Sequence, residues 1–245
     1  MITKDFEIVI PARFNSSRLK GKPLIEVNGK TILERTVLKC NQLVDLDKIK
    51  VLTDSNKIFT FCNNKKIPCE VVDNNCRTGT DRISLYTKNK NLDFVINVQG
   101  DEPLIEPKDI EIILKKSLND NKIYNGYKKI NSLDDYNNPS IPKVVFDKNS
   151  NLLYMSRAGI PSSKELKFNK AFKQVCIYSY PLDSLKLFQE NPDKGFLENF
   201  EDIEILRFLE LGRKVKMVET FGNSFSIDTP NDLLKLKKHL EFEKN

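Results

Sequence analysis

Strand-like apolar runs alternate with helical patterns over the first 120 residues, and this alternation restricts the fold more than any other feature. Strands are expected at 6–10, 50–53, 70–72 and 94–98. Helices are expected to begin at Thr31, at Asp54 or Ser55, at Thr80 and at Pro107. The first of them presents on one face Ile32, Leu33, Thr36, Val37 and Cys40. Such alternation is typical of a parallel, doubly wound sheet, whose ligands bind at the carboxyl ends of the strands.

The pattern weakens between residues 122 and 171. Short strand-like runs remain there at 143–146 and 152–155. We interpret 122–171 as an excursion from the main sheet rather than as an independent domain. A return to the α/β pattern is expected with a strand at 175–178 and helices near 199–211 and 231–241. We therefore expect one domain over residues 1–245, with a Rossmann-like α/β fold and a mostly parallel central sheet flanked by helices.

Composition excludes several classes of protein. Of 245 residues, 39% are hydrophobic and 30% are charged, as in a globular domain. No apolar run approaches the roughly 20 residues of a membrane helix, so we expect a cytoplasmic protein without membrane contact. The five cysteines form no C-x-x-C pair and are expected to be reduced. The 40 basic residues are scattered among 34 acids, and the net charge of +6 suits anionic substrates but by itself decides little against a nucleic-acid or membrane partner.

A basic loop follows the first strand. It carries Arg13, Arg18 and Lys22 around Gly21, just past the predicted strand end. Glycine lets main-chain N–H groups approach phosphate oxygens, and the cations supply charge. The loop therefore predicts a triphosphate site, with an ordinary basic surface loop as the alternative. Neither a P-loop nor a dinucleotide-binding glycine motif is present.

Three further segments can carry chemistry. Asp101, in the string Asn97-Val98-Gln99-Gly100-Asp101-Glu102-Pro103, follows the fourth strand, where a carboxylate can bind Mg²⁺ or simply form a turn. Asp228 precedes Thr229-Pro230, which by itself indicates the start of a helix. At Thr78-Gly79-Thr80 main-chain amides can reach a nucleotide, and Arg82 can face its base or phosphates. The alternative at this position is a plain helix cap.

The basic loop resembles that of a known family. Residues 10–24 are similar to the opening of nucleotide-sugar pyrophosphorylases, and the pattern "IPAR…SSRL.GKPL" resembles the CMP-Kdo synthetases. The string "NVQGDEP" at 97–103 matches the motif of that family letter for letter. Further similarity lies at 77–82, at 154–161 and at 228–233. Asn28-Gly29, just after the loop, itself predicts a tight type I′ turn.

The resemblance implies a nucleotidyltransferase fold and a set of functional residues. Mg²⁺ would be held by Asp101 and Asp228, and catalysis would involve Arg13, Lys22 and Asp101. Nucleotide contacts would come from Ala12, Arg13, Arg18, Gly21, Lys22, Thr78, Gly79, Thr80, Arg82, Gln99 and Gly100. Sugar contacts would come from Arg157, Gln174, Tyr178, Glu204 and Asp228. The excursion would contribute to the sugar site and to a homodimer interface.

Some positions depart from the family pattern. Gln174 stands at the usual histidine, Cys176 and Ser179 replace two glycines, and Ile205 replaces a glutamine. Two sugar-contacting polar positions are thereby altered, and such contacts decide how well a site discriminates between substrates. The expected sugar is therefore Kdo or a relative, such as an 8-amino or sialic-type acid.

The reaction implied is transfer of CMP from CTP to a 3-deoxy-2-ulosonic acid, with release of pyrophosphate. The product would be a CMP-activated sugar for lipopolysaccharide or capsule synthesis, and the activity that of a 3-deoxy-manno-octulosonate cytidylyltransferase. The only histidine, His239, lies on the C-terminal basic helix, so a histidine base is not expected. The alternative of another class is an inactive nucleotide-binding regulator or a nucleic-acid binder, which salt-dependent binding would reveal.

Overall fold

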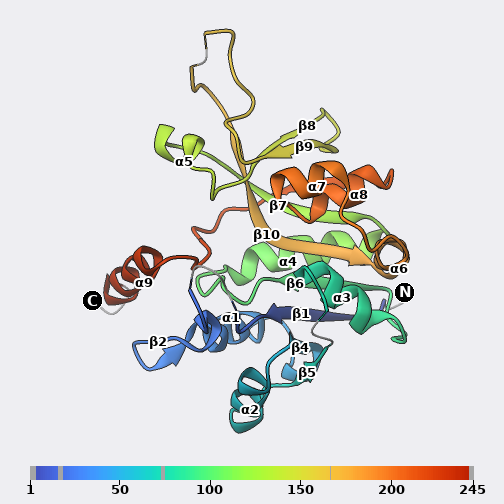
Figure 1. Cartoon of the computed structure of the whole chain (residues 1–245), viewed down its shortest axis with the longest axis vertical. Helices are drawn as coiled ribbons and strands as arrows, with labels where there is room; N and C mark the ends of the chain where they lie inside the picture. The colour runs from blue at the N-terminus through green and yellow to red at the C-terminus, as the bar shows by residue number, and fades with distance from the viewer. Residues whose placement is uncertain (1–3, 16–18, 73–74, 166, 243–245) are drawn as a thin grey trace.

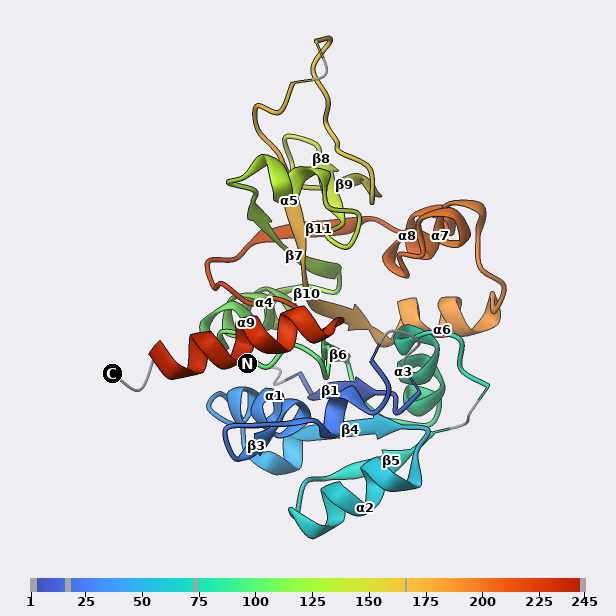
Figure 2. The same cartoon turned by 60° about the vertical axis from the view of Figure 1, so that its left-hand side comes forward.

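One large sheet runs through the molecule (Figures 1 and 2). The computed structural model describes residues 4–15, 19–72, 75–165 and 167–242. Within them the sheet follows the order β11 (Val215–Glu219), β7 (Ile123–Lys129), β10 (Phe172–Pro181), β6 (Phe94–Val98), β1 (Phe6–Ala12), β4 (Ile49–Thr53) and β5 (Cys69–Val71). Neighbouring strands are parallel, except that β10 is antiparallel to both β6 and β7. The mostly parallel sheet is confirmed.

Helices cover both faces of this sheet. One face packs against α1 (Ile32–Cys40), α2 (Asn56–Asn64) and α4 (Pro107–Asn119). The other packs against α3 (Gly79–Thr87), α6 (Leu182–Glu190) and the pair α7 (Phe196–Glu201) and α8 (Ile205–Glu210). Strand β1 serves both layers, because Ile8 and Ile10 enter the first cluster and Val9 enters the second.

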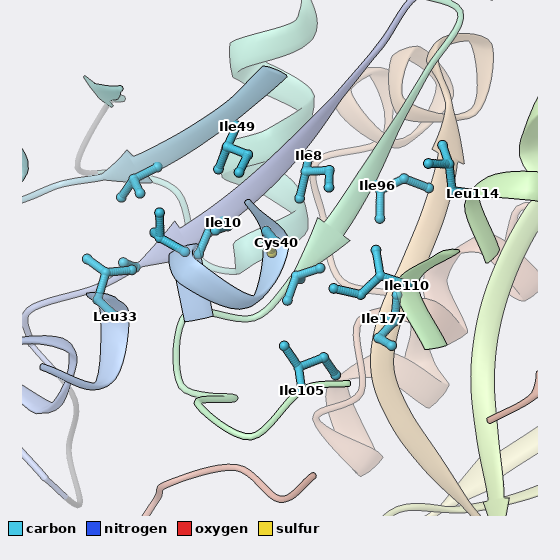
Figure 3. Packing of buried hydrophobic residues seen from close by; sticks show 14 of the residues in the cluster. Ile8, Ile10, Leu33, Cys40, Ile49, Ile96, Ile105, Ile110, Leu114 and Ile177 are labelled. Carbon is cyan, nitrogen blue, oxygen red and sulfur yellow. The ribbon is translucent and has the colours of Figure 1, made fainter. Parts of the chain in front are cut away.

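The first layer shows how the sequence pattern becomes a core (Figure 3). Ile10, Ile96 and Leu33 bring side chains from β1, β6 and α1 to one cluster. All five residues predicted to share a face of α1 are buried. Burying an aliphatic side chain of this size stabilises the fold by about 1.5–3 kcal/mol, so this face fixes α1 on the sheet.

Local signals account for several element boundaries. Thr31 caps α1 by accepting a hydrogen bond from the Glu34 N–H, and Ser55 caps α2 by accepting from the Lys57 N–H. Asn28 and Gly29 both have positive φ angles, 49° and 77°, as a type I′ turn requires. They join β2 (Glu26–Val27) to β3 (Lys30–Thr31), so the predicted turn is confirmed.

The predicted excursion begins later than expected. β7 occupies 123–129 and is a member of the main sheet, so 122–171 is wrong as the extent of the excursion. Asn125 and Gly126 interrupt its apolar alternation, which hides the strand in the sequence. The excursion comprises α5 (Leu133–Asn137), β8 (Lys143–Phe146) and β9 (Leu152–Ser156). It remains attached to the sheet because β8 pairs with β10 as well as with β9.

Several other elements complete the chain. The pattern did not predict α6 or β11, and the helix expected near 199–211 is the pair α7 and α8. The last helix, α9 (Pro230–Phe242), packs Leu236 and Leu240 against the β2–β3 hairpin (Figure 2). Short 3-10 helices lie at Lys22–Leu24 and Leu46–Lys48. No helix in the described residues is both long and apolar enough to cross a bilayer.

A buried arginine fastens α7 and α8 to the rest of the molecule. Arg207 is 1% exposed and donates from Nε and Nη2 to the two carboxylate oxygens of Glu198. Its Nη1 donates to Asp81 of α3 over 3.0 Å, and its guanidinium carbon lies 3.7 Å from the ring centroid of Phe188. One side chain therefore joins α8 to α7, α3 and α6, and so fixes the loop between α7 and α8.

We predict that Arg207→Met lowers the free energy of unfolding by about 3–5 kcal/mol, because it leaves the buried Glu198 carboxylate without its partner. Urea unfolding followed by circular dichroism measures the change. The matched control is Lys186→Met, which removes an exposed i,i+4 pair with Glu190 and should cost less than about 1 kcal/mol. Equal effects of the two substitutions would contradict this account.

Candidate active site

A cleft of about 490 Å³ lies over the carboxyl ends of β1 and β6 and beside β10. It gathers most of the residues predicted from the sequence. These are Ala12, Arg13, Lys22, Gly79, Gln99, Gly100, Asp101, Arg157, Gln174, Tyr178, Glu204 and Asp228. Of the other predictions, Gly21, Thr78, Thr80 and Arg82 do not line it, and Arg18 lies outside the described residues.

A larger hollow of about 720 Å³ lies elsewhere, between α3 and α6. Its lining includes Lys88, Leu182 and Lys186 but none of the predicted functional residues. It is also remote from the carboxyl ends of the parallel strands, where ligands bind in sheets of this kind. The smaller cleft is therefore the candidate active site.

Asp101 and Asp228 meet in the cleft although 127 positions separate them, as their numbers show. The Ile227 N–H donates a hydrogen bond to the Asp101 carbonyl oxygen over 2.9 Å, so the two loops run side by side. Gly100 allows the loop after β6 to approach β1, because a Cβ there would lie 3.0 Å from the Pro11 carbonyl oxygen. Backbone contacts thus help to bring the two carboxylates together.

Side chains of α4 and β7 hold the start of the segment that carries Asp228. Asp109 of α4 is 2% exposed and accepts hydrogen bonds from the N–H groups of Phe221 and Gly222, over 2.9 and 2.8 Å. Lys128 of β7 donates to the carbonyl oxygens of the same two residues. These four hydrogen bonds hold Phe221 and Gly222, at the start of the connection from β11 to α9 that carries Asp228.

A buried carboxyl group lies next to Asp101. Glu102 is 4% exposed and accepts a hydrogen bond from the Ser224 hydroxyl. Burial raises the pKa of Glu102 to about 7, and the nearby charge of Asp101 acts in the same direction. Its contact with Ser224 ties the loop after β6 to the segment carrying Asp228. Sequence patterns do not reveal this role, because Glu102 stands among the residues of a turn, where charged side chains are usually exposed.

Lys22 lies between the two aspartates. Its Nζ donates to Asp101 Oδ2 and, over 2.9 Å, to Asp228 Oδ1. Burial lowers the pKa of Lys22, but the charges of Asp101 and Asp228 outweigh burial and the pKa is raised. Gly21, with φ of 72°, shapes the backbone that leads into Lys22 and does not itself reach the cleft. The ammonium is therefore held in its charged form.

The donor set of Asp101 and Asp228 fits Mg²⁺. Both carboxylates reach one cationic atom, the Lys22 Nζ, which shows that they converge on a common point. Among the described residues no three His, Cys, Asp or Glu side chains gather as a self-sufficient metal site. Mg²⁺ needs only one or two protein carboxylates when phosphate oxygens and water complete its shell.

The N-terminus of α3 differs from its prediction. Thr78 and Asp81 form a capping box, and Glu204 accepts hydrogen bonds from the Gly79 and Thr80 N–H groups, over 3.1 and 2.8 Å. The amides predicted to bind a nucleotide are thus already occupied. Glu204 lines the cleft, but both of its carboxylate oxygens serve α3. A negative charge at a helix start is stabilising, which explains the contact.

Arg82 is placed in the core, against the prediction that it faces the nucleotide. Its side chain is 0% exposed and donates to the Val72 carbonyl oxygen and to Asp54 Oδ2, over 2.7 and 2.9 Å. Arg82 is the fourth residue of α3, and its side chain extends from the helix towards the ends of β4 and β5 rather than towards the cleft. It links the ends of β4 and β5 to α3.

The far end of the cleft is formed by the excursion and β10. Arg157 lines it, and its guanidinium donates to the main-chain carbonyl oxygens of Pro139, Glu201 and Asp202. These contacts join the excursion to the loop after α7, so Arg157 has a structural role at the cleft wall. Its side chain is still 35% exposed, which leaves it accessible to a ligand.

A bulge in β10 shapes the same end. The register of β10 against β7 shifts between Val175 and Tyr178, and Asn125 donates to the carbonyl oxygens of Val175 and Ile177, both over 3.0 Å. Gln174 donates to Asn125 Oδ1 over 3.2 Å. The bulge brings Cys176 to the cleft wall beside Gln174 and Tyr178. Sequence reasoning missed Asn125, because a buried asparagine in a strand has no periodic signature.

Comparison with known proteins finds relatives along nearly the whole chain. The sequence model of the cytidylyltransferase family matches residues 8–238. A 3-deoxy-manno-octulosonate cytidylyltransferase of Thermodesulfovibrio yellowstonii is 38% identical over 248 residues, which cover 95% of this chain and 96% of the relative. An 8-amino-3,8-dideoxy-manno-octulosonate cytidylyltransferase of a Shewanella species is 35% identical over 240 residues, which cover 95% and 97%.

A solved structure shows the same architecture over the whole chain. It is the CMP:2-keto-3-deoxy-manno-octonic acid synthetase in complex with CTP, with 30% identity, a TM-score of 0.89, and coverage of 98% of this chain and 99% of that one. A thymidylyltransferase structure from Bacillus anthracis, at 16% identity and a TM-score of 0.70, shares the fold. The family model, the sequence identity to relatives and the structural match all agree. The chain belongs to the cytidylyltransferase family.

Proposed function

We propose that this protein transfers CMP from CTP to a 3-deoxy-2-ulosonic acid and releases pyrophosphate. The observation that carries the proposal is the convergence of Lys22, Asp101 and Asp228 at the carboxyl ends of β1 and β6. Family membership and relatives named as 3-deoxy-manno-octulosonate cytidylyltransferases support it. An inactive regulator would have no need of two carboxylates and a lysine in contact, which argues against that alternative.

The residues of the cleft have distinct tasks in this reaction. Arg13 and Lys22 neutralise the triphosphate, and Asp101 and Asp228 would hold Mg²⁺. When bound, Mg²⁺ offsets negative charge and makes the attacking hydroxyl more acidic. The C2 hydroxyl oxygen of the sugar forms a bond to the α-phosphorus of CTP and loses its proton, and the bond from that phosphorus to the pyrophosphate oxygen breaks. Catalysis rests on alignment and charge, as in other phosphoryl-type transfers.

The two substrates would enter at opposite ends. The triphosphate would lie beside Arg13 and Lys22 on the parallel strands, and the sugar acid beside Arg157, Gln174 and Tyr178. An arginine suits a carboxylate because the planar guanidinium can pair with both oxygens. Arg157 donates three hydrogen bonds to main-chain carbonyl oxygens and also lines the cleft.

We further propose that the protein is cytoplasmic and works as a homodimer. All five cysteines are free thiols, which suits a reducing compartment. The rings of Phe196 and Phe200 of α7 contact each other in a tilted arrangement while 71% and 76% exposed, and such an aromatic surface is typical of an interface. Light scattering of the purified protein should give twice the mass of one chain, and the monomer mass would contradict the dimer.

We predict that Asp101→Asn reduces the rate of pyrophosphate release about 100-fold or more, because one of the two carboxylates for Mg²⁺ loses its charge. Removal of Mg²⁺ by a chelator should abolish turnover of the unsubstituted protein, and its return should restore it. Asp183→Asn, on α6 and away from the cleft, is the matched control and should leave the rate unchanged. Full activity of Asp101→Asn, or turnover in chelator, would contradict the proposed site.

The identity of the acid is tested with a substrate panel. We expect pyrophosphate release with Kdo, slower release with its 8-amino analogue, and the slowest with neuraminic acid, since relatives named for the first two cover almost all of the chain. Gln174→His introduces the residue usual in the family and should change the ratio of the pyrophosphate release rates with the different acids by up to about tenfold. Activity of this variant should still depend on Asp101. Turnover of neuraminic acid alone would contradict the assignment.

A further inference from the structure

The Lys22 ammonium occupies the place where the two carboxylates converge. Its side chain is 13% exposed, and those of Asp101 and Asp228 are each 21% exposed, so water screens this cluster only weakly. Two carboxylates that face each other in such a setting repel each other. The Lys22 ammonium removes this penalty by contacting both.

A cation at this point excludes another one. Mg²⁺ binds oxygen atoms at about 2.0–2.1 Å and needs their lone pairs directed at the ion. In this structure one oxygen of each carboxylate already accepts a hydrogen bond from the Lys22 ammonium, which lies where the two side chains converge. Lys22 and a divalent cation therefore compete for Asp101 and Asp228.

The backbone of Lys22 is held in place, and only its side chain would have to move to leave the aspartates. Lys22 begins a short 3-10 helix, Gly21 donates a main-chain hydrogen bond to Phe14 over 2.8 Å, and Pro23 is buried. The four-carbon stem of a lysine rotates easily, and its ammonium is a compact charge that binds phosphate as well as carboxylate. The side chain can thus leave the aspartates for a phosphate without a change in the fold.

We propose that Lys22 acts as a placeholder, which fills the metal position in the free enzyme and releases it only when a triphosphate takes its ammonium. This inference rests on the proposed function and adds an order of binding. A divalent cation alone should bind weakly, because it must displace Lys22 into solvent. With CTP present the displaced ammonium gains a phosphate partner, so metal and nucleotide bind together.

Binding of Mn²⁺ to the metal-free protein tests the placeholder without any turnover. Free Mn²⁺ is measured by electron paramagnetic resonance, with and without CTP. In the absence of CTP, Lys22→Met should bind Mn²⁺ at least about tenfold more tightly than the unsubstituted protein. The unsubstituted protein should gain affinity when CTP is added, and this gain should shrink in Lys22→Met.

Two controls distinguish the direct contact of Lys22 with the aspartates from a general effect of positive charge in the cleft. Arg13→Met removes one positive charge from the same cleft, but Arg13 bonds the Arg77 carbonyl oxygen and not the aspartates, so its effect should be much smaller. The double variant Lys22→Met with Asp101→Asn should lose the tighter binding. Lys22→Gln serves in place of Lys22→Met if the latter does not fold, as judged by circular dichroism.

The outcomes distinguish this inference from the proposed function. Equal Mn²⁺ affinity of Lys22→Met and the unsubstituted protein without CTP, or an equal rise in Arg13→Met, would overturn the placeholder while leaving the metal site intact. Failure of the unsubstituted protein to bind Mn²⁺ even with CTP would overturn the metal role of Asp101 and Asp228, and the placeholder with it. Tighter binding confined to Lys22→Met supports the placeholder.

Discussion

A single main-chain hydrogen bond, from the Ile227 N–H to the Asp101 carbonyl oxygen, connects the two parts of the chain on which the cleft depends. Asp101 is placed by β6, in the centre of the sheet, whereas Asp228 arrives from the segment beyond β11 at its edge. The backbone bond aligns these segments, and Asp109, Lys128 and Glu102 prevent the second one from moving away. The acidic pair is thus a product of the whole fold rather than of one motif.

Opposed charges complete this arrangement. Carboxylates at Asp101 and Asp228 would repel each other if nothing cationic lay between them, and Lys22 supplies the cation. The same logic recurs at α3, where Glu204 satisfies the amides of a helix start, and at Arg207, which neutralises Glu198 in the core. The charged groups at these three places are therefore matched within the protein before any substrate is bound.

The sequence predicted the parts of the fold that have a strong period. The strands at 6–10 and 94–98, the helix from residue 31 and the Asn28-Gly29 turn follow directly from local pattern and propensity. The pattern does not reveal β7, because Asn125 and Gly126 interrupt its apolar alternation. Asn125 instead donates hydrogen bonds to β10. Arg82 and Glu204 were assigned to ligands because a sequence shows charge but not the direction of a side chain. Partnerships of this kind depend on tertiary packing.

The antiparallel strand β10 divides the sheet into two parallel blocks, β6-β1-β4-β5 on one side and β7-β11 on the other. Arg13 and Asp101 follow strands of the first block, whereas the bulge of β10 and its support from Asn125 belong to the boundary with the second. Changes at the bulge can therefore accumulate without disturbing the backbone of the first block. The division of the sheet thus separates the two walls of the cleft mechanically, because each wall is supported by a different block of parallel strands.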